Sequence, residues 1–170
     1  MSMRRQDGPP VPLIEEVTAD SIALVEATRA IFREYADSLG IDLSFQHFEE
    51  ELQQLPGDYA PPRGTLLLAR IGGVIAGCCA LRPLETADDP NAAEMKRLYV
   101  RPSFRGCGLG RQLAQRALDA ARQGGYSCVL LDTLSDMETA RALYAELGFE
   151  EIAPYYHNPI AGSHYLKVSL

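Results

Sequence analysis

Three alternating glycines and two arginines stand together in the middle of the chain, in the run Arg105-Gly106-Cys107-Gly108-Leu109-Gly110-Arg111. Apolar residues recur at helical spacing from Leu109 onward, so a helix is predicted to begin inside this run. A helix N-terminus presents unpaired backbone N–H groups and the positive end of a macrodipole, and both favour phosphate groups. The glycines allow a phosphate to approach the backbone closely, and the arginines add positive charge. The run therefore predicts a loop that binds a pyrophosphate.

Positive charge is concentrated around this loop, although the 170-residue chain as a whole carries a net charge of −7 at pH 7. Six basic residues stand against one acidic residue between Glu94 and Arg116. This local excess favours a small polyanionic ligand, whereas the overall negative charge argues against a general nucleic-acid binder. Taken alone, the basic residues would be better explained as a solvated face of the protein.

Two common nucleotide-binding loops do not fit the run. A dinucleotide fingerprint, G-x-G-x-x-G, would need a glycine where the chain has Arg111 or Leu113. A Walker loop needs Gly-Lys followed by Ser or Thr, and the sequence contains no such triplet. The remaining pattern is Arg105-x-x-Gly108-x-Gly110 after a predicted strand. A nucleotide-phosphate binder is therefore the weakest functional alternative.

Predicted strands and helices alternate along the chain, which is typical of the α/β fold class with a mixed sheet. Apolar runs bounded by turn residues predict strands at 11–17, 65–71, 74–84, 94–100, 127–132, 149–152 and 165–168. Apolar stripes at helical spacing predict helices at 20–40, 44–55, 108–124 and 135–148, the last with a capping box from Ser135 to Glu138. Gly72-Gly73 predicts a tight hairpin. We expect one domain over residues 11–170, preceded by a flexible tail over residues 1–10.

The pattern Arg105-x-x-Gly108-x-Gly110 resembles the coenzyme-A-binding motif of the GCN5-related N-acetyltransferase (GNAT) family. A second family element follows it, Ala140–Tyr144 leading to Leu147–Glu150, and the resemblance extends in element order from Val11 to Leu170. It implies a mixed, mostly antiparallel sheet flanked by helices, with a splayed strand pair that holds coenzyme A. The runs Asp132-Thr133-Leu134 and Tyr155-Tyr156-x-Asn158-Pro159-x-x-Gly162 resemble patterns of a bacterial-type subgroup whose substrates are poorly defined.

The resemblance implies acetyl-CoA as co-substrate and places its binding residues along one strand, the glycine loop and the next helix. Backbone groups of Leu98 and Val100 would contact the pantetheine arm. Many relatives carry an asparagine where this chain has Met137, so one hydrogen bond to coenzyme A is expected to be missing. The expected coenzyme-A-binding residues are Leu98, Tyr99, Val100, Arg105, Gly106, Cys107, Gly108, Leu109, Gly110, Arg111 and Met137.

Two residues are candidates for proton transfer. An amine attacks a thioester only when unprotonated, so a base is useful at neutral pH, and Glu94 at the start of the loop-proximal strand is the candidate. Its alternative role is an ion pair with Lys96 or Arg97. Tyr144 matches the family tyrosine that protonates or stabilises the leaving thiolate, with plain core packing as its alternative.

The acceptor site of the family is built from the first helix–loop–helix and the loop between the last two strands. Phe45, Tyr156 and Asn158 are therefore the candidate substrate-binding residues. The second loop also contains turn-forming residues, so its polar groups could instead stabilise the loop itself.

The function that follows is transfer of an acetyl group from acetyl-CoA to a primary amine of a small molecule or peptide. The alternative is a non-catalytic domain that binds acyl-CoA or serves regulation. The four cysteines and three histidines show no metal-ligand spacing, so no metal is expected. The N-terminal stretch lacks an apolar run, which indicates a cytoplasmic protein without a membrane or nucleic-acid partner. The sequence leaves open whether the protein forms a homodimer.

Overall fold

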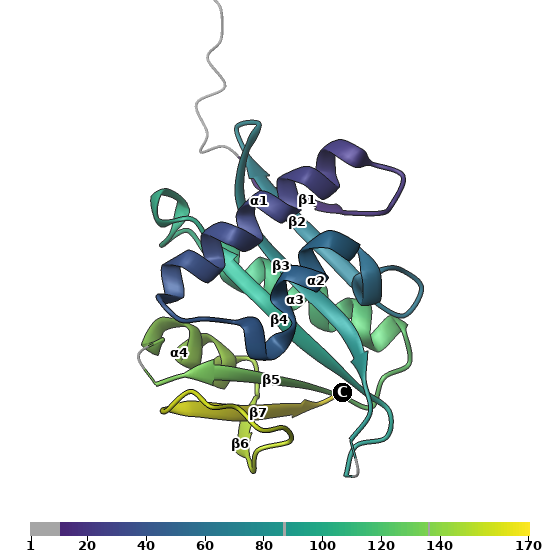
Figure 1. Cartoon of the computed structure of the whole chain (residues 1–170), viewed down its shortest axis with the longest axis vertical. Coiled ribbons are helices and arrows are strands. Elements are labelled where there is room, and N and C mark those ends of the chain that lie inside the picture. Colours follow the sequence, from purple (N-terminus) through teal and green to yellow (C-terminus); the bar gives the residue numbers. More distant parts are fainter. Residues whose placement is uncertain (1–10, 87, 136) are drawn as a thin grey trace, which may run out of the picture.

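The computed structural model describes residues 11–86, 88–135 and 137–170. Its strands form a seven-stranded sheet in the order β1-β2-β3-β4-β5-β7-β6, in which β4 and β5 run parallel and the other neighbouring strands antiparallel (Figure 1). The strands are β1 (Leu13–Glu16), β2 (Thr65–Ile71), β3 (Val74–Leu84), β4 (Ala92–Val100), β5 (Cys128–Leu134), β6 (Glu150–Ile152) and β7 (Ser163–Ser169). The helices are α1 (Ile22–Leu39), α2 (Phe48–Gln54), α3 (Leu109–Gln123) and α4 (Glu138–Glu146), with short 3-10 turns at Ser44–Gln46, Gly57–Tyr59 and Pro102–Phe104. The predicted mixed α/β fold is confirmed.

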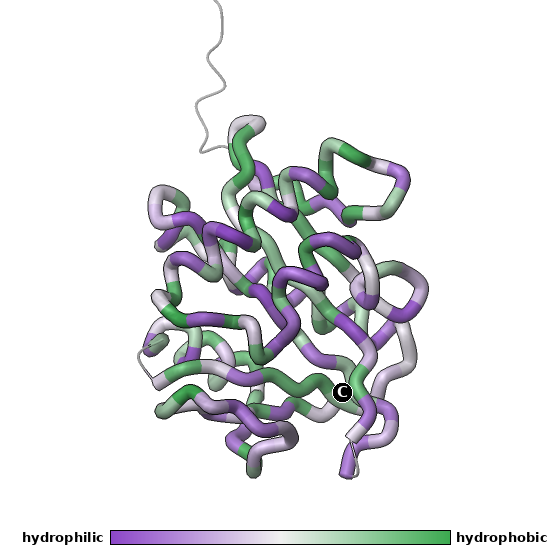
Figure 2. Tube along the Cα trace, in the orientation of Figure 1, coloured by the Kyte–Doolittle hydropathy of each residue, from purple (hydrophilic) through white to green (hydrophobic). Residues whose placement is uncertain are grey.

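Both faces of the sheet are buried. Alternate residues of β2 point to opposite faces, so that Leu67 belongs to a core cluster with α3, and Leu66 and Leu68 to a second cluster with α1 and α2. Figure 1 shows α3 behind the sheet and α1 and α2 in front of it. Figure 2 shows that hydrophobic residues gather along the central strands, whereas the helices alternate between hydrophobic and hydrophilic residues.

The glycine pair between β2 and β3 forms the predicted hairpin. Gly72 and Gly73 have φ angles of 58° and 77°, the left-handed values that a tight two-residue connection requires. Both strand ranges, 65–71 and 74–84, agree with the prediction. The prediction succeeds because a hairpin is determined by residues that are close together in the sequence, here two apolar runs and the turn between them.

Two local predictions are wrong. The predicted helix 44–55 is divided into a 3-10 turn and α2, because His47 adopts a left-handed conformation with φ of 56°. The predicted capping box is absent, because α4 begins at Glu138 with Met137 before it and without a side-chain cap. The Ser135 hydroxyl instead donates to the Gly162 carbonyl at 2.9 Å, so a contact with the β6–β7 loop replaces the cap.

The predicted tail over residues 1–10 lies outside the described residues. Within residues 11–86, 88–135 and 137–170, no helix is both long enough and apolar enough to cross a membrane.

Candidate functional site

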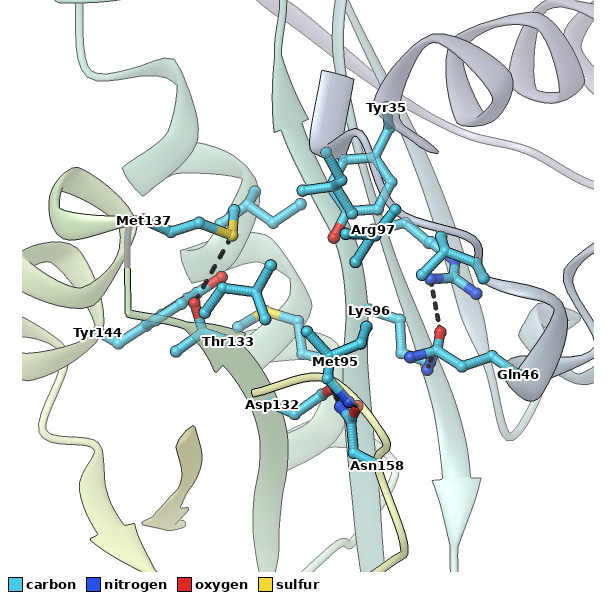
Figure 3. A pocket seen from close by; sticks show the side chains of 16 residues that line it. Tyr35, Gln46, Met95, Lys96, Arg97, Asp132, Thr133, Met137, Tyr144 and Asn158 are labelled. Carbon is cyan, nitrogen blue, oxygen red and sulfur yellow. Dashed lines mark hydrogen bonds between the residues drawn. The ribbon is translucent and has the colours of Figure 1, made fainter. Parts of the chain in front are cut away.

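A cavity opens where β4 and β5 move apart. The two strands pair only from Ala92 to Glu94 on β4 and from Cys128 to Leu130 on β5. Beyond this point β4 still pairs with β3 and β5 with β7, so the facing backbone edges have no partner strand among the described residues. The space has a volume of about 620 Å³, part of it open to solvent. Its wall consists of Tyr35, Leu39, Ile41, Leu43, Gln46, Met95, Lys96, Arg97, Leu98, Asp132, Thr133, Leu134, Met137, Tyr144, Asn158 and Ile160 (Figure 3).

A bulge in β4 directs Lys96 and Arg97 toward this cavity. The pairing register with β3 shifts between Cys78 and Ala80, and Arg97 adopts a φ of 61°. Its guanidinium donates to both carboxylate oxygens of Glu51, at 3.0 and 3.2 Å, and to Gln46 Oε1 at 2.9 Å. The charge of Arg97 is therefore neutralised by one carboxylate in a two-point contact.

Lys96 is the second cation of the wall and is less completely paired. Its side chain is 5% exposed, and Nζ lies 3.2 Å from Gln46 Oε1 and 3.8 Å from Glu94 Oε1. Burial lowers the pKa of the Lys96 ammonium, and the Glu94 charge partly opposes this effect. Because an ammonium has three donors, Lys96 retains the capacity to bind a further acceptor.

Asp132 carries the negative charge on the opposite side of the cavity. Its Oδ2 accepts hydrogen bonds from the Tyr156 hydroxyl at 2.5 Å and from Asn158 Nδ2 at 3.3 Å. The Tyr156 oxygen accepts in turn from Gln46 Nε2 at 3.3 Å. A continuous chain of hydrogen bonds thus connects Lys96, Gln46, Tyr156 and Asp132. Asp132 is the one carboxylate in the cavity wall among the described residues.

Glu94 lies beneath the cavity and does not form part of its wall. The side chain is 2% exposed, and Oε1 accepts from Arg82 while Oε2 accepts from the Tyr155 hydroxyl at 2.7 Å. Burial alone would raise the pKa of Glu94, but the charges of Lys96 and Arg82 outweigh it and hold the pKa below 4.5. The predicted base is therefore an ionised, fully paired carboxylate that is separated from the open space.

Tyr144 projects from α4 into the cavity, and its ring packs against Phe149 at 5.6 Å between centroids. The hydroxyl forms no hydrogen bond with a described residue, and Figure 3 shows it pointing toward Thr133 and Met137 in the cavity wall. Burial raises the pKa of Tyr144 well above its usual range. The group therefore stays protonated and can donate a hydrogen bond. Core packing and a role in the cavity are combined in one side chain.

The glycine loop lies between β4 and α3. Gly106 and Gly108 have φ angles of 84° and 83°, and no atom lies within 4 Å of where their Cβ atoms would be. Both glycines thus serve backbone conformation and leave the outer surface of the loop open. A Cβ added at Gly110 would be in ordinary van der Waals contact with Val100 and Leu143.

The arginines at the two ends of the loop are partly engaged. Arg105 Nε donates to the Val100 carbonyl at 2.9 Å, and Arg111 forms an exposed ion pair with Glu146. The Cys107 thiol is exposed and donates to the Phe104 carbonyl. The first N–H groups of α3, from Leu109 onward, have no hydrogen-bond acceptor within the helix. Open N–H groups, a glycine-lined surface and two cations fit a pyrophosphate.

The other predicted coenzyme-A residues are distributed over both sides of β4. Leu98 lines the cavity, whereas the Tyr99 side chain belongs to the core cluster on the other face and packs against Tyr35 at 5.8 Å between centroids. Met137 lines the cavity and its sulfur lies 3.9 Å from Thr133 Oγ1. Tyr99 can therefore contribute backbone groups, but its side chain does not reach the cavity.

The predicted acceptor residues are also divided. Asn158 lines the cavity and Tyr156 is hydrogen-bonded behind it, while Phe45 packs in the core beside α1 and α2. The sequence reasoning missed Gln46, Lys96 and Asp132. Asp132 ends an otherwise apolar run, and Lys96 is one of two lysines in the chain. These two sequence features could have singled out Asp132 and Lys96, whereas nothing in the sequence distinguishes Gln46.

Comparison with known proteins identifies the family. The model of the Acetyltransferase (GNAT) family matches residues 26–149. An uncharacterized N-acetyltransferase of Schizosaccharomyces pombe is 39% identical over 143 residues, which cover 84% of this chain and 86% of that protein. A GNAT-family acetyltransferase structure from Staphylococcus aureus superimposes with a TM-score of 0.73 at 19% identity, covering 94% of this chain and 99% of that one.

A further solved structure was determined with acetyl-CoA bound. It is a putative acetyltransferase from Salmonella typhimurium, with a TM-score of 0.64 at 20% identity and 93% coverage of each chain. This likeness shows the fold. The family model and the sequence relatives show more: the chain belongs to the GNAT family and is an N-acetyltransferase.

Proposed function

We propose that this protein transfers an acetyl group from acetyl-CoA to a primary amine of a small molecule or peptide, by direct attack of the amine on the thioester. The observation that carries the proposal is the separation of β4 from β5 after Glu94 and Leu130. Among the described residues, the separation leaves two backbone edges without a partner strand beside the cavity, and β4 leads from there to the glycine loop before α3. An extended ligand with a pyrophosphate at one end and a reactive group at the other fits this arrangement.

The residues of the glycine loop would hold the pyrophosphate. Backbone N–H groups from Gly106 to Arg111 and the two flanking arginines supply the positive potential. Backbone groups of Leu98 and Val100 would pair with the pantetheine arm. Acetyl-CoA, when bound, supplies an activated acyl group and a thiolate leaving group.

Asp132 is the proposed acceptor of the proton that the amine loses, directly or through a water molecule. It is a carboxylate in the cavity wall, and its Oδ2 is fixed by Tyr156 and Asn158. Glu94 was the candidate from sequence, but its contacts with Arg82 and Tyr155 favour a positioning role beneath the cavity. A lowered pKa also makes a carboxylate a weaker base.

Tyr144 is the proposed donor to the leaving thiolate. Its hydroxyl is protonated, points toward Thr133 and Met137 in the cavity wall and has no competing partner among the described residues. Hydrogen bonding to a developing anion in a site of low polarity is worth more than in water.

A test of this function is an acceptor screen with acetyl-CoA that measures release of free thiol and confirms the acetylated product by mass. We expect thiol release that depends on a primary amine. The alternative, a non-catalytic acyl-CoA-binding domain, would bind acetyl-CoA and raise the melting temperature without thiol release across broad panels. Stabilisation by ATP and not by coenzyme A would contradict both.

A further inference from the structure

The cavity has walls of opposite charge. On the β4 side, Lys96 and Arg82 share one carboxylate, that of Glu94, while Arg97 is neutralised by Glu51. This side therefore carries an excess of one positive charge. On the β5 side, Asp132 receives hydrogen bonds only from the neutral groups of Tyr156 and Asn158 among the described residues.

A chain of hydrogen bonds connects the Lys96 ammonium to the Asp132 carboxylate. Gln46 accepts from Lys96 through Oε1 and donates to the Tyr156 hydroxyl through Nε2, and Tyr156 donates to Asp132. In Figure 3, Lys96 and Gln46 lie on one side of the cavity, Tyr144 and Thr133 on the other, and Asp132 between them. In this view Asp132 lies on the Tyr144 side of Lys96.

The geometry points to an amino acid as the acceptor, with its amine at Asp132 and its carboxylate at Lys96. This inference rests on the proposed function, since it names the substrate class of that reaction. An ammonium arriving from water would be stabilised by Asp132 until it gives up its proton there, and the neutral amine would then stand on the side of Tyr144. The neutral amine nitrogen forms a bond to the acetyl carbon and the bond to sulfur breaks. The nitrogen then loses its second proton, which passes to the thiolate, so that Asp132 holds one proton and the coenzyme-A thiol the other.

The position of Lys96 supports recognition of an anion. The Lys96 side chain is only 5% exposed, although lysine side chains are seldom buried in proteins. Burying a cation is costly unless it is paired. A substrate carboxylate would supply a counter-charge that Lys96 need not share with Arg82, and it would favour the charged form of Lys96, whose pKa burial lowers.

The test compares matched acceptors in the acetyl-CoA thiol-release assay. L-α-amino acids are measured against their carboxamides, and 4-aminobutanoate is measured against butylamine, in which a methyl group replaces the carboxylate. We expect kcat/KM for the best amino acid to exceed that for its uncharged counterpart by about 10- to 100-fold, the range of one charge-assisted hydrogen bond. Uncharged amines that react as fast as the amino acids would overturn the inference and leave the proposed function standing.

Lys96→Met removes the charge and retains most of the side-chain volume, and it should abolish the preference for the carboxylate. Lys167→Met is the matched control, because Lys167 lies on β7, pairs with Asp89 and should leave the preference intact. A preference that survives in Lys96→Met would contradict the inference. If that variant does not fold, Lys96→Gln replaces it. The comparison of matched acceptors on the unmodified protein tests the preference for a carboxylate without any variant.

A binding measurement separates this inference from the proposed function. With coenzyme A at saturation, an amino acid should raise the melting temperature and its carboxamide should not. If the amino acid stabilises the protein and its carboxamide does not, but acetyl-CoA releases no thiol, recognition of the carboxylate is supported and the proposed acetyl transfer is overturned. Equal stabilisation by both compounds would overturn recognition.

Discussion

The Tyr155 hydroxyl donates a hydrogen bond to Glu94 Oε2 at 2.7 Å, and this contact joins the β6–β7 loop to the part of β4 that still pairs with β5. Glu94 Oε1 is at the same time occupied by Arg82 at 2.8 Å. Both oxygens of a nearly inaccessible carboxylate are thus engaged at the base of the cavity. Glu94 is in a position to fix Tyr155, Arg82 and Lys96.

Glu94→Gln should lower the free energy of unfolding by about 3 kcal/mol, because it leaves Arg82 and Lys96 without their shared counter-charge. Denaturant titration measures this change. Glu146→Gln is the control, since Glu146 belongs to an exposed ion pair and its loss should matter little. If both variants lose the same small amount, the ion pairs of Glu94 do not stabilise the fold.

The same group gives stability a pH dependence. The pKa of Glu94 is lower in the folded protein than its ordinary value of 4.5, so its contribution is complete above about pH 4.5 and is lost as the pH falls through the folded pKa. Denaturant titrations from neutral pH downward should show this loss in the unmodified protein and a smaller one in Glu94→Gln.

The turnover rate of Glu94→Gln as a function of pH adds a kinetic test. A positioning role predicts a lowered rate at every pH, whereas a role as base predicts a loss of rate that grows at low pH.

Gly108→Ala should weaken coenzyme-A binding by about tenfold or more, because Gly108 adopts a φ of 83° at the start of α3, where backbone N–H groups are expected to face the pyrophosphate. The left-handed conformation should also cost about 1–2 kcal/mol of stability for alanine. Gly125→Ala is a matched control, with a φ of 78°, open space around it and a position at the other end of α3.

Calorimetric titration with coenzyme A distinguishes the two glycine variants. Both should lose similar stability, and only Gly108→Ala should lose affinity. Equal affinities in the two variants would show that the loop does not bind the pyrophosphate.

The elements of this fold were largely predictable, because their signals are local. The β2–β3 hairpin follows from Gly72-Gly73 between two apolar runs, and α3 ends at Gln123, directly before Gly124, where the apolar stripe ends. The glycine turn before α3 was predictable for the same reason, since Gly106, Gly108 and Gly110 lie within five consecutive residues, and its binding of a pyrophosphate stays a prediction. The capping box was not, because the contact of Ser135 with Gly162 comes from residues 27 positions apart.

The charged lining of the cavity depends on distant contacts that no local pattern encodes. Gln46 meets Lys96 across 50 positions and Tyr156 across 110 positions. Arg97 adopts a left-handed conformation that a β-strand pattern does not predict, and the resulting bulge decides which side chains of β4 face the cavity. Glu94 was chosen from its position along the strand, and its burial became visible only with Arg82 and Tyr155 in place.

Asp132→Asn should lower kcat/KM by about 100-fold, because the amide retains a hydrogen-bond acceptor for Tyr156 but cannot take up the proton of the amine. Steady-state kinetics with the best acceptor of the screen measure this change. Asp89→Asn is the control, since Asp89 pairs with Lys167 and does not line the cavity. An unchanged kcat/KM in Asp132→Asn would remove Asp132 from the proposed mechanism.

Tyr144→Phe should reduce kcat by about 100-fold and leave the dissociation constant of coenzyme A nearly unchanged, because the hydroxyl acts on the leaving thiolate and the ring retains its packing against Phe149. Tyr126→Phe is the matched control, since Tyr126 is equally buried and its hydroxyl donates to the Arg63 carbonyl instead of facing the cavity. Single-turnover measurements with acetyl-CoA and a saturating acceptor isolate the chemical step from product release. Equal rates in the two variants would assign Tyr144 to core packing alone, and a loss confined to coenzyme-A affinity would make it a binding residue.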